Sequence, residues 1–222
     1  MQFEILTIFP KIITDYIGES ILKRGLAAGL IKITAHDFRK FTTDRHQKVD
    51  DSPYGGGAGM VLKVEPIYNC LESLGLVKNG QKKKQVGTKV IIMDPAGKKF
   101  DQKKAKQFSK LKKLVIICGR YEGFDERVYK FVDEKISLGD YVLSGGELGA
   151  LAITEAVSRL RPGVLGNKES LKEETFEAKK NMAQAEYPHY TRPEVFKNLK
   201  VPKILLSGDH QKIYDWRLKK SR

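Results

Sequence analysis

The sequence predicts an α/β protein in which a parallel sheet is covered by helices. Strand and helix patterns alternate through the first 162 residues, as is typical of parallel sheets. Apolar stretches such as 114–118 indicate buried strands. The composition, 41% hydrophobic and 31% charged, is that of a folded protein. No apolar run approaches the roughly 18 residues that a membrane span needs.

The elements of this alternation are defined by apolar periodicity and by glycine or proline at their ends. Gly29 marks the end of the first helix, and a glycine-rich loop, DRHQKVDDSPYGGGAGM, precedes the second. The connection NGQKKKQVG is expected to be exposed, and Phe100, Phe108, Leu111 and Leu114 to form a helix face. In order, we predict strands at 3–8 and 31–38 around a helix at 15–28, a helix at 64–76, strands at 90–93 and 114–118, a short helix at 124–131 and a strand near 135–143.

A further helix is predicted after Ser144-Gly145-Gly146-Glu147. This spacing is that of a capping box, in which Ser144 caps the helix and Glu147 reaches back to the cap residue. The helix ends at Pro162-Gly163. Its predicted buried stripe consists of Leu148, Leu151, Ala152, Ala156, Val157 and Leu160.

The composition changes after Gly163, and this change divides the chain. We predict a main domain at 1–162, a flexible linker at 163–187 and a small, shortened C-terminal domain at 188–222. A helix near 193–199 and a final amphipathic helix anchored by Trp216 are expected there. Some 35 residues cannot bury a sufficient core. This domain is therefore expected to pack on another surface, such as a second copy of the chain.

The net charge of +14 is concentrated in two blocks. Residues 78–113 hold 13 basic and two acidic side chains, and residues 197–222 hold eight and two. Such blocks on a nearly neutral body indicate a polyanionic partner, most simply a nucleic acid. The alternative is that the lysines around Lys103, Lys104 and Lys106 only solvate a helix face.

Several function classes are disfavoured. The glycine cluster 54–60 has neither a P-loop ending nor the spacing of a dinucleotide fingerprint, and Val142 breaks the nucleophile elbow that Ser144 would need. The four histidines lack metal-ligand spacing. Two cysteines, Cys70 and Cys118, exclude a disulfide framework, and the N-terminus lacks secretory features. A reducing cytosol is the expected location.

Three glycine-bearing turns, at 93–97, 118–123 and 138–147, each follow an apolar strand. In open parallel sheets, ligands bind beyond the carboxyl ends of the strands. Glycine allows the backbone to approach a flat heterocycle closely. The turns therefore predict a crevice with Arg120, Tyr121 and Glu122 beside it, although any α/β domain also needs glycine at such turns.

Four long motifs carry a family resemblance: GRYEGFDERV, LGDYVLSGGELGALAITEAVSRLRPGVLGN, DDSPYGGGAGM and YPHYTRPEVF…VPKILLSGDHQKIYDWR. Over nearly its whole length the chain resembles the TrmD family of bacterial tRNA (guanine-N1)-methyltransferases, in the SPOUT superfamily. The resemblance implies a deep C-terminal trefoil knot, an exception to ordinary unknotted topology. It also implies transfer of a methyl group from S-adenosylmethionine to N1 of the guanosine 3′ to the tRNA anticodon, position 37, which maintains the reading frame.

The resemblance further implies a homodimer, in which the active site combines the knot of one subunit with the linker and C-terminal domain of the other. The implied cofactor contacts, mainly backbone groups, are Pro95, Gly97, Gly119, Tyr121, Glu122, Leu138, Gly139, Asp140, Tyr141, Val142, Leu143, Gly145 and Gly146. The implied tRNA contacts are Arg120, Ser170, His189, Arg192, Lys197, Lys212 and Arg217.

The catalytic residues implied are Glu174 and Arg159. Glu174 stands where the family has an aspartate as general base, and Glu173 is the alternative. Arg159 would stabilise negative charge at guanine O6. Glu122 could accept a guanine N–H or hold Mg²⁺, or it could be an ordinary first-turn carboxylate.

Two other readings stay open. A related knotted methyltransferase could act on a ribose hydroxyl or another RNA. A relative without catalysis could bind RNA only, and the Asp-to-Glu change and the short C-terminus are the features that would favour it.

Overall fold

The computed structural model describes residues 1–166 and 187–221. The chain divides into two compact units, Met1–Gly166 and Asn167–Arg222. Most of the linker predicted at 163–187 lies outside the described residues. Within the described ranges, no helix combines the length and the apolar character needed to cross a membrane.

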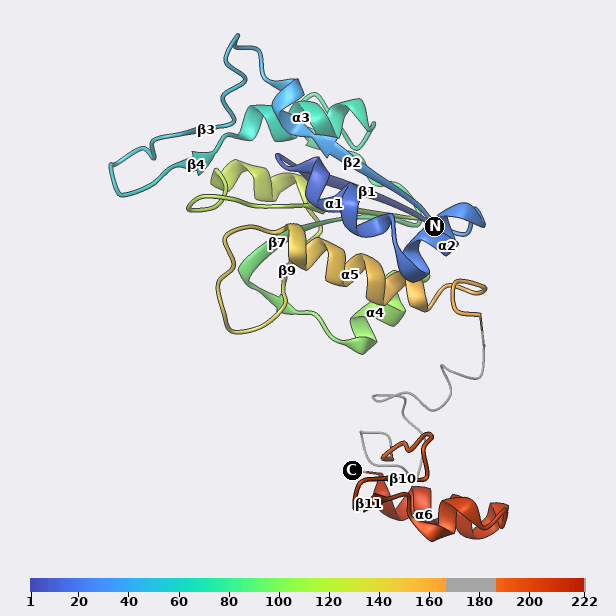
Figure 1. Ribbon diagram of the computed structural model, residues 1–222. Coiled ribbons are helices and arrows are strands. Elements are labelled where there is room, and N and C mark those ends of the chain that lie inside the picture. The colour runs from blue at the N-terminus through green and yellow to red at the C-terminus, as the bar shows by residue number, and fades with distance from the viewer. Residues whose placement is uncertain (167–186, 222) are drawn as a thin grey trace. The chain divides into compact units, whose positions relative to one another are not determined.

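Five parallel strands form the sheet of the first unit, in the order β2-β1-β8-β7-β9 (Figure 1). They are β1 (Gln2–Thr7), β2 (Lys32–Asp37), β7 (Thr88–Lys99), β8 (Lys113–Ile117) and β9 (Glu134–Ser137). Every pairing between neighbours is parallel. The predicted fold class, a parallel sheet covered by helices, is confirmed.

Helices cover both faces of this sheet (Figure 1). On one face, Phe3 and Ile5 of β1 pack in a core shared with four helices, α1 (Pro10–Ile17), α2 (Ser20–Ala27), α4 (Gln102–Phe108) and α5 (Glu147–Arg159). On the other face, Leu6 packs in a core with α3 (Val64–Ser73) and the 3₁₀ segments η1 (Phe38–Phe41) and η2 (Glu126–Phe131). The side chains of β8 alternate between the two cores, which explains why its sequence is continuously apolar.

Two short strand pairs flank the sheet. Strands β3 (Asp50–Asp51) and β4 (Val61–Leu62) close the base of the glycine-rich loop. Strands β5 (Val77–Lys78) and β6 (Gln81–Lys82) form a hairpin that takes in the start of the connection expected to be exposed. Its turn residues, Asn79 and Gly80, both have positive φ, as the Asn-Gly hairpin turn requires.

Some predicted boundaries were wrong. The helix expected at 15–28 is two helices, because the chain is interrupted at Gly18–Glu19 and Ser20 adopts a φ of 53°. The strand expected at 135–143 ends at Ser137, whose side chain exchanges hydrogen bonds with Gly139. Leu114 belongs to strand β8 and not to a helix face with Phe108.

The predicted capping box was also wrong. Helix α5 begins at Glu147 with Gly146 as its cap residue, and no side chain caps it. Glu147 is buried and bonds to other elements. Leu148 is 60% exposed and Ala152 is exposed as well, so both were misplaced in the predicted buried stripe. Leu151 and Val157 of the predicted stripe are buried, and so are Ala150, Ile153 and Thr154.

In the second unit the structure describes residues 187–221. A hairpin of β10 (Val195–Phe196) and β11 (Leu199–Lys200) replaces the helix predicted near 193–199, and Lys197 in its turn has a φ of 54°. The segment η4 (Lys203–Leu206) and helix α6 (His210–Lys220) follow. Asp209 caps α6 by accepting a bond from the Lys212 amide at 3.1 Å. The Trp216 ring lies 6.4 Å from that of Tyr190, which ties the final helix to the start of the unit.

Candidate active site

A cavity of about 330 Å³ lies at the carboxyl ends of β7, β8 and β9. It is built from the three turns that the sequence singled out, together with the start of α5. We call it the cleft. Its lining comprises Met93, Asp94, Pro95, residues 119–124, Glu126, Tyr129, residues 136–138, residues 141–146 and Gly149.

The second and third turns are joined through their main chains. The Gly146 N–H donates to the Gly119 carbonyl at 2.9 Å, and Arg120 pairs with Gly145 in an antiparallel bridge. A Cβ atom on Gly146 would lie 2.9 Å from both Cys118 Cα and Met93 Cβ. Glycine is needed here because backbone meets backbone, and this contact fixes the shape of the cleft floor.

The first turn is a bulge in β7. The pairing of β7 with β9 shifts register between Met93 and Lys98, and Asp94 to Gly97 form the extra segment. A Cβ on Gly97 would lie 2.5 Å from the Ile136 nitrogen, so this glycine permits close contact between the two strands. Bulges of this kind redirect side chains at sites.

Of the predicted cofactor contacts, three do not line the cleft: Gly97, Gly139 and Asp140. Gly97 faces β9, and Gly139 lies against the Tyr141 ring. Asp140 is exposed and pairs with Lys99 at 2.5 Å. The structure brings the other ten together around the cavity: Pro95, Gly119, Tyr121, Glu122, Leu138, Tyr141, Val142, Leu143, Gly145 and Gly146.

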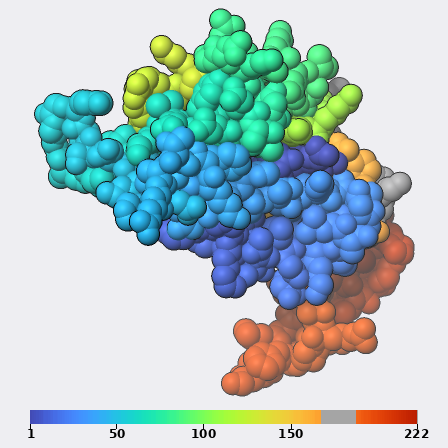
Figure 2. Space-filling view, turned by 90° about the horizontal axis from the view of Figure 1, so that it is seen from above, coloured from blue at the N-terminus to red at the C-terminus, as the bar shows by residue number. Residues whose placement is uncertain are grey.

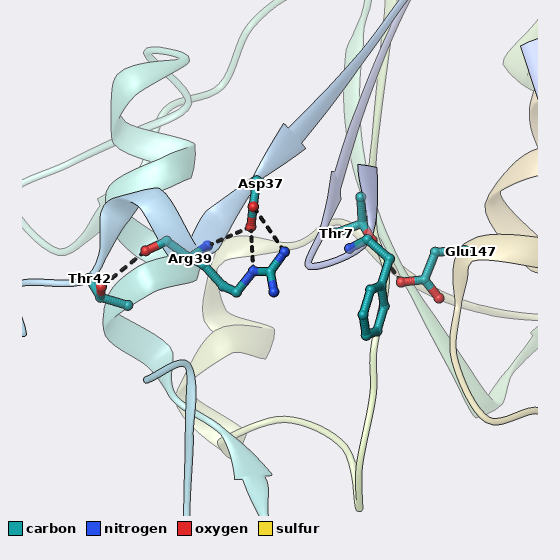
Figure 3. Close-up of polar contacts among 6 residues, drawn as sticks. Thr7, Asp37, Arg39, Thr42 and Glu147 are labelled. Carbon is teal, nitrogen blue, oxygen red and sulfur yellow. Dashed lines mark hydrogen bonds and ion pairs between the residues drawn. The ribbon is translucent and has the colours of Figure 1, made fainter. Parts of the chain in front are cut away.

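A buried ion pair fastens the second turn to α5. Glu147, whose side chain is 2% exposed, accepts bonds from Arg120 Nε at 3.1 Å and Nη2 at 3.0 Å. Its other oxygen accepts from the Thr7 hydroxyl at 2.7 Å, which connects it to the end of β1 (Figure 3). Arg120, which we listed as a tRNA contact, thus also positions the wall of the cleft.

Two arginines flank the exposed ring of Phe9. The Arg120 guanidinium carbon lies 4.6 Å from the ring centroid, and that of Arg39 lies 5.8 Å from it. Asp37 holds Arg39 by accepting from its Nε and Nη2, each at 3.1 Å, and from its backbone N–H at 3.0 Å (Figure 3). The Arg39 carbonyl accepts from the Thr42 hydroxyl at 3.0 Å. The carboxyl ends of β1 and β2 are therefore rigidly organised next to the cleft.

Sequence reasoning missed a polar group in the cleft wall, Asp94. Its carboxylate accepts from the Ala96 N–H at 2.8 Å and from the Tyr129 hydroxyl at 2.6 Å. Burial, and then the bond to Asp94, raise the pKa of Tyr129 well above its usual range. Asp94 could have been suspected from its place in the first turn. Tyr129 carries no comparable signal, because only the fold brings η2 to this wall.

Tyr121 and Glu122 occupy the mouth of the cleft. Tyr121 is exposed and has a φ of 59°, a strained backbone conformation that is concentrated at functional sites. Partial desolvation of its hydroxyl, and then the neighbouring charge of Asp50, raise the pKa of Tyr121. The Glu122 N–H donates to the Met60 carbonyl at 3.0 Å, and its side chain packs on Gly59. The glycine-rich loop therefore docks on this turn.

The remaining predicted residues lie elsewhere. Arg159 is the last residue of α5 and is not part of the cleft lining. Ser170, Glu173 and Glu174 lie outside the described residues. His189, Arg192, Lys197, Lys212 and Arg217 all belong to the second unit. There, Lys212 pairs with Asp209 at 2.9 Å, and the Arg217 guanidinium lies 4.6 Å from the Tyr187 ring.

No group of three or more His, Cys, Asp and Glu side chains with metal-binding geometry occurs in residues 1–166 and 187–221. Both cysteines are free and buried. Burial, and then the charges of Asp37 and Glu4, raise the pKa of the Cys70 thiol to about 12. The described cleft therefore presents backbone groups, aromatic rings and single carboxylates.

The fold and the cleft define a parallel α/β protein with a loop-built cavity at the carboxyl edge of its sheet. A family model described as tRNA (Guanine-1)-methyltransferase TrmD matches residues 1–222. The chain belongs to this family of tRNA-modifying methyltransferases, and the resemblance seen in its motifs is confirmed.

Curated relatives align over the whole chain. A tRNA (guanine-N(1)-)-methyltransferase of Carboxydothermus hydrogenoformans is 49% identical over 222 residues, which cover 100% of this chain and 83% of the relative. A protein of the same name from Listeria innocua is 47% identical, and the alignment covers 100% of this chain and 87% of that relative. One from Shouchella clausii is 46% identical, and the alignment covers 100% of this chain and 86% of that relative.

Proposed function

We propose that this protein transfers a methyl group from S-adenosylmethionine to N1 of the guanosine 3′ to the tRNA anticodon, position 37. The observation that carries the proposal is the convergence of three glycine-bearing turns on one cleft in a chain of this family. A ligand at this edge of a parallel sheet follows the general rule for such folds.

The residues of the cleft fit the proposed cofactor. A cavity of about 330 Å³ is within the range of small-molecule sites. Its wall offers aliphatic side chains and the Tyr141 ring to a nucleoside, and backbone groups from three turns to its polar edges. The carboxylates of Asp94, Glu122 and Glu126 also line it, and their negative charge suits a cationic ligand. When bound, S-adenosylmethionine would supply an activated methyl group on its sulfonium.

The protein's own contribution is to position guanine and to remove its N1 proton. We assign the removal of this proton to Glu174 of the partner subunit. An exposed glutamate, with a pKa of about 4.3, is a weak base for this task. A partly dehydrated setting would raise the pKa of that carboxylate and improve it. Arg159 would stabilise negative charge that develops at O6.

Two observations support the proposed homodimer. Near the cleft, Val142 and Leu148 are 80% and 60% exposed, and exposed apolar groups next to a site are typical of interfaces. In the second unit, no residue from 188 to 221 is buried, as expected of a module completed by another surface. A monomer at full activity would contradict the composite site.

We place the tRNA contacts at Arg120, Ser170, His189, Arg192, Lys197, Lys212 and Arg217. Phosphate contacts by such residues would make tRNA affinity fall steeply with salt. The deep trefoil knot and a cytoplasmic location also belong to this proposal.

Supplementing the assay with Mg²⁺ or with a chelator tests whether the reaction needs the metal. Loss of the Mg²⁺ effect in Glu122→Gln would support a contact at Glu122.

The decisive experiment is incubation with labelled S-adenosylmethionine and bulk tRNA, followed by digestion to nucleosides. Recovery of 1-methylguanosine is the expected result. A 2′-O-methyl nucleoside would favour a ribose methyltransferase, and the absence of label would favour an RNA-binding relative.

The base is tested in single-turnover assays of Glu174→Gln with Glu173→Gln as the matched control. We expect Glu174→Gln to lose far more rate, on the order of 100-fold or more. The reverse order would move the base to Glu173. Equal, full activity of both variants would remove the linker carboxylates from the mechanism.

A further inference from the structure

A positively charged surface lies at the end of the sheet opposite the cleft. All five strands are parallel, so the cleft marks their carboxyl ends, and their amino ends form the other edge. Five exposed lysines lie along this amino edge, and we call them the N-edge lysines: Lys32, Lys83, Lys84, Lys110 and Lys112.

Backbone contacts connect the three segments that carry these lysines. The Lys112 N–H donates to the Gly87 carbonyl at 2.8 Å, which joins the turn before β8 to the connection that carries Lys83 and Lys84. Lys32 and Lys113 pair with Gln2 from opposite sides, so the starts of β2 and β8 are two strand spacings, about 10 Å, apart. Figure 2 shows the part of the chain around residues 75–115, in green, gathered at one side of the visible face.

Among the residues that the structure describes, ion pairs do not compensate the charge of this surface. Within the described part of the chain, no carboxylate forms an ion pair with any of the five N-edge lysines. The neighbouring acids are already engaged, because Asp133 pairs with Lys82, and Glu134 pairs with Lys89 and Lys104. A merely solvated face usually mixes both signs of charge. Here the positive charge of the N-edge lysines has no acidic partner among the described residues.

We propose that the N-edge lysines bind the phosphate backbone of RNA, at a segment other than the one that enters the cleft. The inference rests on tRNA being the substrate. Four of the five, all but Lys32, lie outside helices and strands, and such lysines act as flexible point charges, which suits contact with a phosphate backbone without sequence reading. A membrane surface fits less well. In the connection 83–87, Val86 is the one large apolar side chain, and it is 92% exposed. A single valine buries too little apolar area to anchor a protein in a membrane.

The test compares the variant K83Q/K84Q/K112Q with a control that loses the same charge, K23Q/R24Q/K103Q. The control residues are exposed on helices α2 and α4 and form no ion pair in the described chain. The dissociation constant of bulk tRNA is measured from 50 to 300 mM NaCl. Each lost phosphate contact lowers the slope of log affinity against log salt by roughly 0.7–0.9.

For the N-edge variant we therefore expect a slope lower by about 2 and affinity at 0.1 M salt weaker by about tenfold or more, with the control within about threefold of wild type. Binding of S-adenosylhomocysteine should be unchanged in both variants. Equal weakening in both variants would overturn the proposal, because net charge alone would explain it. Unchanged tRNA binding, with lost binding to phosphatidylserine vesicles, would overturn it in favour of a membrane.

Methylation assays of the same variants and of the wild type test this inference separately from the proposed function. With saturating tRNA, the N-edge variant should form 1-methylguanosine at the wild-type single-turnover rate. A wild-type protein that makes no 1-methylguanosine but binds tRNA through the N-edge lysines would refute only the proposed function.

Discussion

Glu147 and Arg120 form a buried, two-pronged ion pair between the first turn of α5 and the second turn of the cleft. One carboxylate oxygen receives both Arg120 Nε and Nη2, while the other receives the Thr7 hydroxyl. Three elements far apart in sequence are thereby held at one point. Glu147 was predicted to take part in a helix cap, but in the structure it holds the cleft wall in place through Arg120 and Thr7.

Replacing Glu147 with alanine should destabilise the fold by about 3 kcal/mol, because Arg120 would be left without a partner in a largely buried place. Urea unfolding measures this change. Glu19→Ala is the control: Glu19 is exposed, caps α2 without a side-chain bond, and should cost no more than about 0.5 kcal/mol. A loss below about 1 kcal/mol for Glu147→Ala would show that the pair contributes little.

Gly146→Ala should destabilise the protein by about 1–3 kcal/mol and weaken S-adenosylhomocysteine binding. The added methyl would press on the main chain of Cys118 and Gly119 and on Met93 Cβ, and the main chain cannot yield without moving the turn. Gly166→Ala is the matched control, since a Cβ there meets nothing within 4 Å. Thermal unfolding and calorimetry provide the two measurements. Equal behaviour of both variants would mean that the turns are not closely packed.

Tyr129→Phe should weaken S-adenosylhomocysteine binding severalfold, because Asp94 loses the hydroxyl that orients it in the cleft wall. A hydrogen bond to a charged group contributes about 1.5–3 kcal/mol, part of which should appear in binding. Tyr68→Phe removes a hydroxyl that donates to Glu72 on α3 and accepts from the Gly80 N–H, outside the cleft lining, and should leave binding unchanged. If both variants bind equally well, Asp94 does not need Tyr129 for its position.

Stability should fall as the pH rises above 9, because the folded state holds the Cys70 thiol protonated. Burial raises its pKa from 9.0 to about 12, so between these values the unfolded chain releases a proton that the folded chain keeps. This thiol should account for about 1 kcal/mol between pH 9 and pH 10. Urea unfolding of wild type and Cys70→Ala at both pH values isolates it. Parallel pH profiles would show that Cys70 does not contribute.

The strands and most helices of the first unit could be predicted because their apolar periodicity is local. Wrong assignments fell where local signals compete with tertiary contacts. Ser144 and Glu147 have capping-box spacing, yet a partner from β1 and another from the second turn satisfy Glu147 better than the helix end would. A helix was predicted near 193–199, but a positive φ at Lys197 turns the chain into a hairpin.

The cleft shows the same division. Its three turns were predictable, because glycine after an apolar strand is visible along the chain. Asp94 and Tyr129 were not found, since their partnership joins a bulge to a 3₁₀ segment 35 residues away. Gly97 was expected at the cofactor; it lies outside the cleft lining and packs on β9, and its cofactor contact stays a prediction. Its reason is backbone contact, which no sequence pattern distinguishes from ligand contact.

The amino-acid order alone determined the fold class, the family and the two basic blocks, because these depend on periodicity, motif spacing and composition. Only the tertiary structure decided which glycines line the cleft, what Glu147 binds, and that Lys32 and four lysines of the first basic block lie at the edge opposite the cleft. Those properties depend on distances between segments remote in sequence, and packing sets these distances after the local elements have formed.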